Sequence, residues 1–406
     1  MSDRGGVPLD LAPRPPHEGE VASVYVHAPF CARRCFYCDF AVQVRRGGDL
    51  SGWIRALEEE LRALEREGTF RLADRLRTLY VGGGTPSLLG PEAMEGLARA
   101  LGRRRLEGGG LEWTAEANPE SFTPRVAEAW RRAGVGRISL GVQSFQESAL
   151  RWMGRLHGPE GALDAVETAR RAGFGEIGVD LIFGLPARLG RDWSADLERV
   201  LDLDVTHVSL YGLTVEEGTP LGRSVAAGRE RVADEARYRE AYLEAAERLS
   251  AGGYVHYEVS NLARPGSESA HNRVYWDGGA YVGLGNSAHS YRHPLRRWNL
   301  ASWDAYREEV ERARPPVAGS EILDAAAERL ERLWLGLRTR RGLATGGAGG
   351  SVEGLLRSWA RAGLAEVAED VVRLTAEGWL VMDRLVVELD DALEATRPVE
   401  ATGPVA

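Results

Sequence analysis

Short apolar runs alternate with amphipathic stretches along the chain from residue 23 to about residue 251. Each run has the length of a buried strand, and each stretch repeats apolar residues at the helical spacing of three and four. Six strand–helix units follow one another, with the strands SVYVH, TLYV, LEWTAEA, RISLGV, IGVDLIF and HVSLYGL. Strands that alternate with helices predict an α/β fold with a parallel sheet and right-handed crossovers.

The first predicted helix, GWIRALEEELRALEREG, carries signals at both ends. Ser51 precedes it, and a serine there can cap a helix by accepting a backbone hydrogen bond. Gly68 follows the last turn, where glycine readily adopts the left-handed conformation that ends many helices. We therefore expect a helix bounded by Ser51 and Gly68.

Chemically distinctive residues lie at the carboxyl end of each predicted strand. HAPFC follows the first strand, GGGTPS (residues 82–87) follows the second, and the other four are marked by Glu116, Gln143, Asp180 and Tyr211. In a barrel these ends meet at one mouth, whereas a doubly wound sheet spreads them along an edge. Six such ends predict a partial (β/α)6 TIM-like barrel with one site at its mouth.

The alternation ends near residue 254. Aromatic, glycine, histidine and asparagine residues then dominate, which indicates loops and short strands that close the open side of the barrel. Helical patterns and a wing-like strand follow, so we expect a small α-rich, winged-helix-like C-terminal domain with a mobile glycine-rich loop in RGLATGGAGGSV. The predicted division is a disordered leader (1–20), the barrel (21–260), the barrel-closing segment (261–300), the C-terminal domain (301–395) and a tail (396–406).

Composition and charge narrow the class of protein. The chain has 51 Lys and Arg against 60 Asp and Glu, and this net charge of -9 gives no general attraction to nucleic acid. No apolar run approaches the ~18 residues needed to cross a bilayer, and the first residues lack the apolar centre of a secretion signal. We expect a soluble cytoplasmic protein that binds no nucleic acid.

All three cysteines, Cys31, Cys35 and Cys38, lie within eight residues after the first strand. An odd, clustered set in a reducing compartment indicates a metal site rather than a disulfide. With His27 as a fourth ligand, the three thiolates would complete a zinc site. Alone, they would leave one iron of a [4Fe-4S] cluster open, and S-adenosylmethionine (SAM) is the chelating ligand that uses such a site for radical chemistry.

The pairing of CxxxCxxC with GGGTP resembles the radical SAM superfamily. The resemblance extends over about residues 20–390 through RISLGVQSF, MGRLH, DLIFGLP, EEGTP and YEVSN. Together these motifs are similar to the subgroup that contains the oxygen-independent coproporphyrinogen III dehydrogenase and a family of heme chaperones. The resemblance implies a [4Fe-4S] cluster on Cys31, Cys35 and Cys38, with exchangeable SAM.

The same resemblance implies roles for residues at the barrel mouth. Tyr25 and Tyr37 would flank the cluster and SAM. Gly83, Gly84 and Thr85 would meet the SAM amino group. The remaining positions that match SAM contacts are Glu116, Gln143, Arg155, Asp180 and Gly212. These positions also have a plainer interpretation, as capping residues, tight turns, a solvated helix charge at Arg155 and a core side chain at Tyr25.

Two features separate the relatives within the subgroup. The dehydrogenase has a further cysteine where this chain has Phe40, and a long N-terminal arm where about twenty residues precede the first strand here. HNRVYW, from His271 to Trp276, resembles an HNxxYW motif of the heme chaperones, and an imidazole beside flat aromatic rings suits heme iron. A structural histidine is the plainer interpretation of His271, and His289 in NSAHS is a second candidate.

The leading hypothesis is a heme chaperone that binds heme and transfers it to an acceptor hemoprotein. The expected acceptor is a respiratory, membrane-bound protein, reached by peripheral contact with the inner face of the membrane, and an electron donor would serve the cluster. The alternatives are a radical SAM enzyme, either coproporphyrinogen III dehydrogenase or a methyltransferase of the same subgroup, and a zinc protein without radical chemistry.

Overall fold

The computed structural model describes residues 7–8, 15–346, 350–368 and 370–395. Residues 1–6 and 9–14 of the predicted leader, residues 347–349 of the predicted glycine-rich loop and the predicted tail (396–406) lie outside the described residues.

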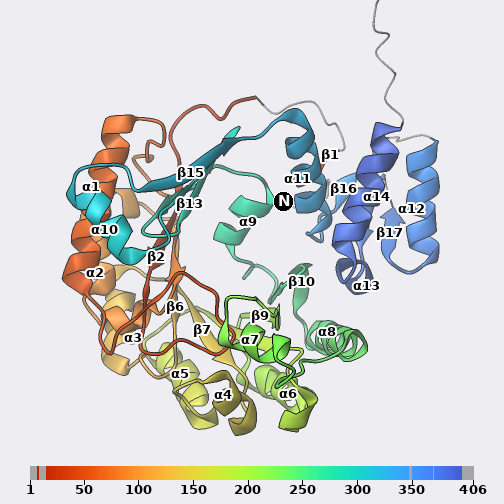
Figure 1. The fold of residues 1–406 in the computed structure, drawn as a ribbon, viewed down its shortest axis with the longest axis horizontal. Helices are drawn as coiled ribbons and strands as arrows, with labels where there is room; N and C mark the ends of the chain where they lie inside the picture. The colour runs from red at the N-terminus through yellow and green to blue at the C-terminus, as the bar shows by residue number, and fades with distance from the viewer. Residues whose placement is uncertain (1–6, 9–14, 347–349, 369, 396–406) are drawn as a thin grey trace, which may run out of the picture.

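Six parallel strands form the centre of the fold, in the order of the chain. They are β2 (Ser23–Ala28), β5 (Thr78–Gly83), β6 (Glu112–Ala117), β7 (Arg137–Gln143), β8 (Glu176–Phe183) and β9 (His207–Gly212). Figure 1 shows the sheet curved into an open arc with helices on its outer face. The helices between the strands are α1 (Leu50–Glu67), α2 (Ala93–Leu101), α3 (Pro124–Ala133), α4 (Glu147–Met153), α5 (Pro159–Arg171), α6 (Trp193–Leu203), α7 (Pro220–Ala226) and α8 (Glu235–Ala251). This arrangement confirms the partial (β/α)6 barrel.

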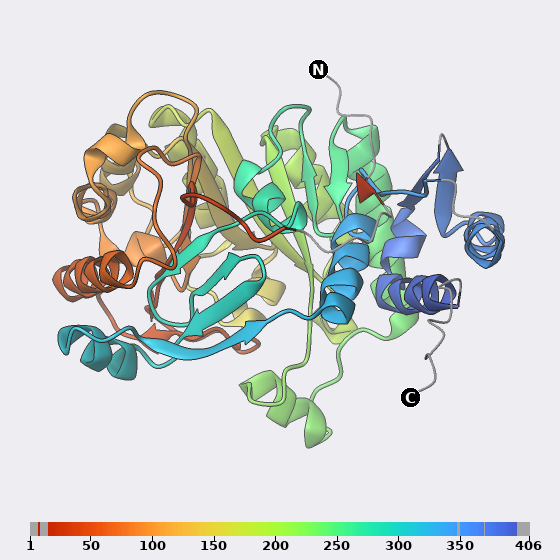
Figure 2. The ribbon, with the colours of Figure 1, turned by 90° about the horizontal axis from the view of Figure 1, so that it is seen from above.

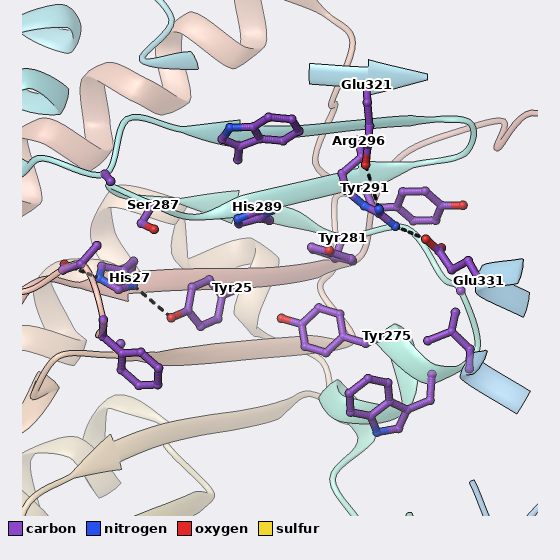
Figure 3. A pocket seen from close by; sticks show the side chains of 18 of the residues that line it. Tyr25, His27, Tyr275, Tyr281, Ser287, His289, Tyr291, Arg296, Glu321 and Glu331 are labelled. Atoms are coloured by element: carbon purple, nitrogen blue, oxygen red, sulfur yellow. Dashed lines mark hydrogen bonds and ion pairs between the residues drawn. The ribbon is translucent and has the colours of Figure 1, made fainter. Parts of the chain in front are cut away.

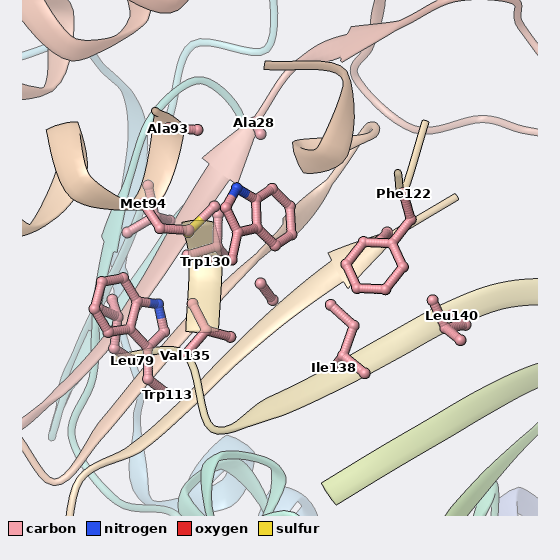
Figure 4. Close-up of a cluster of buried hydrophobic side chains, with 14 of the residues drawn as sticks. Ala28, Leu79, Ala93, Met94, Trp113, Phe122, Trp130, Val135, Ile138 and Leu140 are labelled. Carbon is pink, nitrogen blue, oxygen red and sulfur yellow. The ribbon is translucent and has the colours of Figure 1, made fainter. Parts of the chain in front are cut away.

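The core of the barrel packs between the sheet and the outer helices. Figure 4 shows Trp113 of β6 and Trp130 of α3 in this cluster with Met94 of α2, and all three side chains are at most 1% exposed. The indole N–H of Trp130 lies 3.1 Å from the Gly90 carbonyl oxygen, so the buried donor is paired. Strands that pack against helices in this way appear in the sequence as almost continuous apolar runs, and the sequence pattern therefore locates them.

Helix α1 begins at a different residue from the one predicted. The Asp49 carboxylate caps it by accepting from the Gly52 N–H at 2.9 Å, and Ser51 lies inside the first turn. The Ser51 prediction is wrong because the chain offers two capping side chains in close succession, and aspartate takes the capping position. Gly68 ends the helix with φ of 77°, as predicted.

Three further strands and a helix border the open side of the arc. β12 (Val282–Leu284) pairs parallel with β2, β11 (Asn261–Ala263) pairs antiparallel with β9, and β10 (Val255–Glu258) lies outside β11. Between them the HNRVYW segment forms α9 (Ala270–Trp276), which the Ser269 hydroxyl caps. The expectation of loops and short strands alone is therefore wrong for this segment, because a capping serine starts a helix there.

A small antiparallel sheet follows β12. It consists of β13 (His289–Arg292), β14 (Leu295–Asn299) and β15 (Val317–Ile322). Between β14 and β15, α10 (Trp303–Glu311) packs against α1, so that Trp303, Tyr306 and Val310 belong to the barrel core.

Residues beyond β15 build a second hydrophobic core that includes Leu333, Trp359 and Leu385. Its elements are α11 (Ala325–Leu337), α12 (Ser351–Arg361), α13 (Ala376–Trp379) and α14 (Met382–Glu394), with the hairpin β17 (Ala365–Ala368) and β18 (Val371–Leu374). The hairpin pairs with β16 (Leu343–Ala344), which also pairs with β1 (Val7–Pro8). Figure 2 shows these elements at one side of the barrel. The expected α-rich, winged-helix-like C-terminal region is present.

Candidate functional site

The three cysteines lie in the loop at the carboxyl end of β2. Cys31 ends β3 (Phe30–Cys31), which pairs with β4 (Gln43–Val44), and Cys35 and Cys38 lie between these two short strands. All three thiols are partly exposed. The loop therefore presents them together at the barrel mouth, where a small chelator or an electron donor can approach.

Two polar side chains reach these thiols. The Thr85 hydroxyl donates to the Cys31 Sγ at 3.4 Å, and Arg155 Nη1 donates to the Cys35 Sγ at 3.7 Å. Burial raises the pKa of the Cys31 thiol to about 11 and also raises the pKa of Cys38. Thiolates in this position need a bound cation to stabilise them. The donor set fits a [4Fe-4S] cluster held by one cysteine on each of three irons.

The zinc alternative needs His27 as a fourth ligand. Its Nδ1 lies 3.1 Å from the Tyr25 hydroxyl, and its Nε2 lies 3.2 Å from the Ala41 carbonyl oxygen. Burial lowers the pKa of His27 to about 4. Among the described residues, no three side chains of His, Cys, Asp or Glu lie close enough together to bind one metal ion. With both nitrogens of His27 engaged elsewhere, the residues present do not support the zinc site.

The glycines of GGGTPS bring β5 close to the cysteine loop. Gly83 has φ of 105°, which disfavours any side chain, and an added Cβ would collide with the ring of His27. A Cβ on Gly84 would lie 2.7 Å from the Ala28 carbonyl oxygen. Glycine is therefore required at both positions for the strand end and the loop to approach each other.

Two buried carboxylates project inside the barrel. Glu116 on β6 accepts from the Tyr80 hydroxyl at 2.8 Å and from the Gly83 N–H at 3.0 Å. Asp180 on β8 accepts from the Ser139 hydroxyl at 3.1 Å. Burial, and then the charge of Asp180, raises the pKa of Glu116 to about 7, and burial raises the pKa of Asp180 to about 6. Both groups titrate close to neutral pH and can accept hydrogen bonds from hydroxyl or ammonium groups.

Arg155 and Gln143 show that β7 ends in an unusual conformation. Arg155 follows α4 and donates from Nη2 to Asn118 Oδ1 at 2.7 Å and to the Gly141 carbonyl oxygen at 2.6 Å. It is therefore not the solvated helix charge of the plainer interpretation. Gln143 has φ of 68°, and its buried Oε1 has no hydrogen-bond partner within the described part of the chain. A strained backbone and an unpaired polar atom are typical of a ligand site.

Tyr37 and Gly212 lie at the rim of this region. Tyr37 directly precedes Cys38 in the chain and packs against the cluster of Leu150 and Met153 on α4. Gly212 ends β9, where a Cβ would collide with the Tyr238 hydroxyl. Packing alone thus explains the glycine at Gly212, whereas Tyr37 lies where a residue flanking a cluster is expected.

His271 lies at the opposite end of the strands from the cysteines. Glu112, at the start of β6, accepts from the backbone N–H groups of Ala270 and His271 at 2.9 and 2.8 Å. The His271 Nδ1 lies 2.8 Å from the hydroxyl of Thr78, at the start of β5, and its Nε2 lies 2.8 Å from the Tyr275 hydroxyl. The residue is 1% exposed, and burial lowers its pKa to about 3. As placed here, His271 anchors α9 to the amino ends of the strands and offers neither ring nitrogen to an iron.

A cavity of about 1060 Å³ joins the barrel interior to the small sheet. The barrel contributes Tyr25, Gly83 and Glu116 to its lining, and β13 contributes His289. Figure 3 shows Tyr25 and His27 on β2 below His289, with Tyr275 projecting from α9. The structure thus brings three of the predicted SAM contacts to one cavity together with the second histidine candidate, and His271 is not among its described lining residues.

The sequence interpretation missed several residues of this region. Tyr80 stacks between Tyr25 and His271, with ring centroids 6.1 and 5.3 Å away. Asn118 positions Arg155 and follows β6 directly, so its place in AEANPE was an available signal. Trp298 also lines the cavity. The only signal for it in the sequence is its position two residues after Arg296 in LRRWN, which puts both side chains on the same face of a strand.

Comparison with known proteins shows what the chain is similar to. A family model described as the radical SAM superfamily matches residues 25–200. Proteins named heme chaperone HemW from Mycobacterium tuberculosis H37Rv and Lactococcus lactis IL1403 are 37% and 36% identical to it. These matches cover 93% and 79% of this chain, and 97% and 82% of the relatives. Among solved structures, coproporphyrinogen III oxidase (HemN) from Escherichia coli has a TM-score of 0.75 at 23% identity, covering 94% of this chain and 92% of that one. That likeness shows the fold alone.

Proposed function

The chain belongs to the radical SAM superfamily and, within it, to the HemW family; from this premise we propose that it is a heme chaperone that transfers heme to an acceptor hemoprotein. The observation that carries the proposal is the identity of 37% with a protein named heme chaperone HemW over 97% of that protein. Phe40, which stands where the dehydrogenase of the subgroup has a further cysteine, agrees with it.

Membership of the superfamily implies a [4Fe-4S] cluster and SAM as cofactors, which together supply one-electron radical chemistry when bound. We propose that Cys31, Cys35 and Cys38 hold the cluster, with Arg155 and Thr85 donating to two of the thiolates.

We propose that SAM binds along the ends of β5 to β8. Gly83 and Gly84 bring the backbone at the end of β5 close to the cysteine loop, where its carbonyl groups would meet the SAM amino group. Glu116 and Asp180 would accept hydrogen bonds from its polar groups. The unpaired Oε1 of Gln143 supports a bound polar ligand at this point. Tyr25 and Tyr37 flank the site on the side of the cysteine loop.

Two finer features of the proposal concern partners. The partly exposed cysteines allow an electron donor to approach the cluster. Phe40 and Val44, 58% and 53% exposed beside the cysteines, support a transient contact during delivery to a membrane-bound respiratory acceptor. Within the described ranges, no helix is long and apolar enough to span a membrane.

The second candidate is a radical SAM enzyme, either coproporphyrinogen III dehydrogenase or a related methyltransferase. Its barrel mouth and cofactor residues would be the same, so that the distinction depends on whether a porphyrin is converted or carried.

Heme transfer gives the direct test. The anaerobically reconstituted chain is loaded with hemin, freed of excess, and mixed with an apo-hemoprotein, while absorbance follows the movement of the Soret band. A heme chaperone hands over one heme per chain. Multiple turnovers of coproporphyrinogen III to protoporphyrinogen IX, or no binding of hemin, would overturn the proposal.

A further inference from the structure

A mixed aromatic and polar surface forms one wall of the cavity. Alternate residues of the small sheet face inward, and we call this set the platform: His289, Tyr291, Arg296, Trp298 and Glu321. His289 lies opposite Trp298 across β13 and β14. Gly319 lies opposite Trp298 on β15, where an added Cβ would lie 2.6 Å from the indole. The glycine therefore leaves room for the indole to lie against the sheet.

His289 is the platform residue that can bind a metal. Its imidazole stacks on Trp298, with ring centroids 5.9 Å apart and planes 25° apart. No described residue forms a hydrogen bond with either of its ring nitrogens. Burial, and then Arg296, lowers the pKa of His289, so its imidazole is neutral at pH 7 and keeps a lone pair for iron.

The other two histidines near the cavity are engaged. His27 is bonded through both ring nitrogens to Tyr25 and Ala41, and His271 through both to Thr78 and Tyr275. Iron ligation requires a free imidazole nitrogen, and breaking a buried hydrogen bond to supply one is costly. His289 has no such bond to break.

Further aromatic rings line the same cavity. Tyr275 and Trp276 come from α9, whereas Tyr281, just before β12, lies beside the platform because its backbone pairs with that of Tyr291. Figure 3 shows Tyr275 projecting from α9 toward Tyr25, and its hydroxyl lies 2.8 Å from His271 Nε2. The cavity volume of about 1060 Å³ reaches the upper end of the range for small-molecule sites, about 300–1,000 Å³. A flat macrocycle fits such a space in size and in chemistry.

The charges of the cavity favour one orientation of that macrocycle. Arg296 Nη1 lies 2.9 Å from Glu321 Oε1, and its Nη2 pairs with Glu331. Asp39 and Glu116 add two more carboxylates to the lining. Because the lining carries more carboxylates than cations, propionate groups are repelled from the interior and remain toward solvent.

We propose that His289 is an axial ligand of heme iron in this cavity, with the porphyrin held between the platform and α9. The inference rests on the proposed heme-chaperone function and adds the position of the heme. It places the heme beside Tyr25 and Glu116, so that heme and SAM occupy one continuous cavity.

The test uses the full, anaerobically reconstituted chain as wild type, His289→Ala, His271→Ala and His17→Ala. His17 serves as a matched control because it lies outside the cavity lining. Each protein is titrated with hemin, followed by the Soret band and by EPR of the ferric iron. A parallel titration with metal-free protoporphyrin IX, followed by quenching of tryptophan fluorescence, reports binding that needs no iron ligand.

For His289→Ala we expect about tenfold or more weaker hemin binding and loss of the histidine-ligated EPR signal, with protoporphyrin IX affinity changed less than about threefold. Imidazole added to His289→Ala restores the signal, and both His271→Ala and His17→Ala keep the signal of the wild type. Wild type that fails to bind hemin refutes the proposed function itself. If wild type binds hemin but His289→Ala keeps the signal, or loses both porphyrins equally, the ligand assignment is wrong while the chaperone function stands.

Discussion

Replacement of Glu116 by glutamine tests the carboxylate that we place against SAM. The side chain accepts from the Tyr80 hydroxyl and the Gly83 N–H, and its pKa is raised to about 7, mainly by burial and then by Asp180. Only the ionised form accepts strongly from an ammonium or hydroxyl group. At pH 8 about nine-tenths of a group with this pKa is ionised, and at pH 6 about one-tenth.

We therefore expect SAM affinity to fall about tenfold, or about 1.4 kcal/mol, from pH 8 to pH 6 in the wild type. In Glu116→Gln, the affinity for SAM is low at every pH, and the tenfold change between pH 8 and pH 6 is absent. Calorimetric titration of SAM into the anaerobically reconstituted proteins at several pH values measures both profiles. Glu128→Gln, on the exposed face of α3, is the control for a lost carboxylate.

The same group links the stability of the apo protein to pH. Its pKa is raised from 4.5 to about 7 in the folded protein, so the folded state keeps a proton that the unfolded chain has released. Stability therefore falls as pH rises through this window, by at most about 3 kcal/mol, and by less where cavity water reaches the carboxylate. Urea titrations should show this slope in the wild type and not in Glu116→Gln. The reasoning is refuted if wild type and Glu116→Gln show the same dependence of stability on pH and the same dependence of SAM affinity on pH.

Three further predictions follow from the geometry. Cys35→Ala should abolish the iron–sulfur absorbance after reconstitution, and a full cluster in this variant would show that the ligand set is wrong. Gly83→Ala should lower stability by more than the ~1–3 kcal/mol of backbone strain, because its Cβ also meets the ring of His27. Gly109→Ala is the control, because Gly109 has φ of 81° and open space around an added Cβ, so that this variant carries the backbone strain alone. Thermal unfolding measures the loss of stability in both variants. Glu321→Gln removes one of the two carboxylates that hold the platform arginine, so hemin should bind about two- to fivefold tighter. Weaker hemin binding in absorbance titrations of this variant would contradict the proposed orientation.

The pattern of apolar residues located all six barrel strands because one face of every strand packs against the outer helices in a single core. β6, for example, carries Trp113 and Ala115 into the core between sheet and helices. The apolar pattern does not fix where a helix begins. Asp49 rather than Ser51 caps α1, since two capping residues close together in sequence compete for one position, and packing selects between them.

By itself, the sequence determined the features that depend on neighbouring residues. The six strand–helix units, the cysteine spacing and the glycines after β5 are local patterns, and each specifies its own conformation or chemistry. Tertiary structure decided which distant groups meet. His271 and Thr78 are 193 positions apart and share a hydrogen bond, so the histidine of the HNRVYW motif is engaged at the amino ends of the strands. His289 gains its open place only because β13 to β15 fold beside the barrel. Periodicity describes the burial of a residue within its own element, whereas the partner across a cavity depends on how whole elements pack.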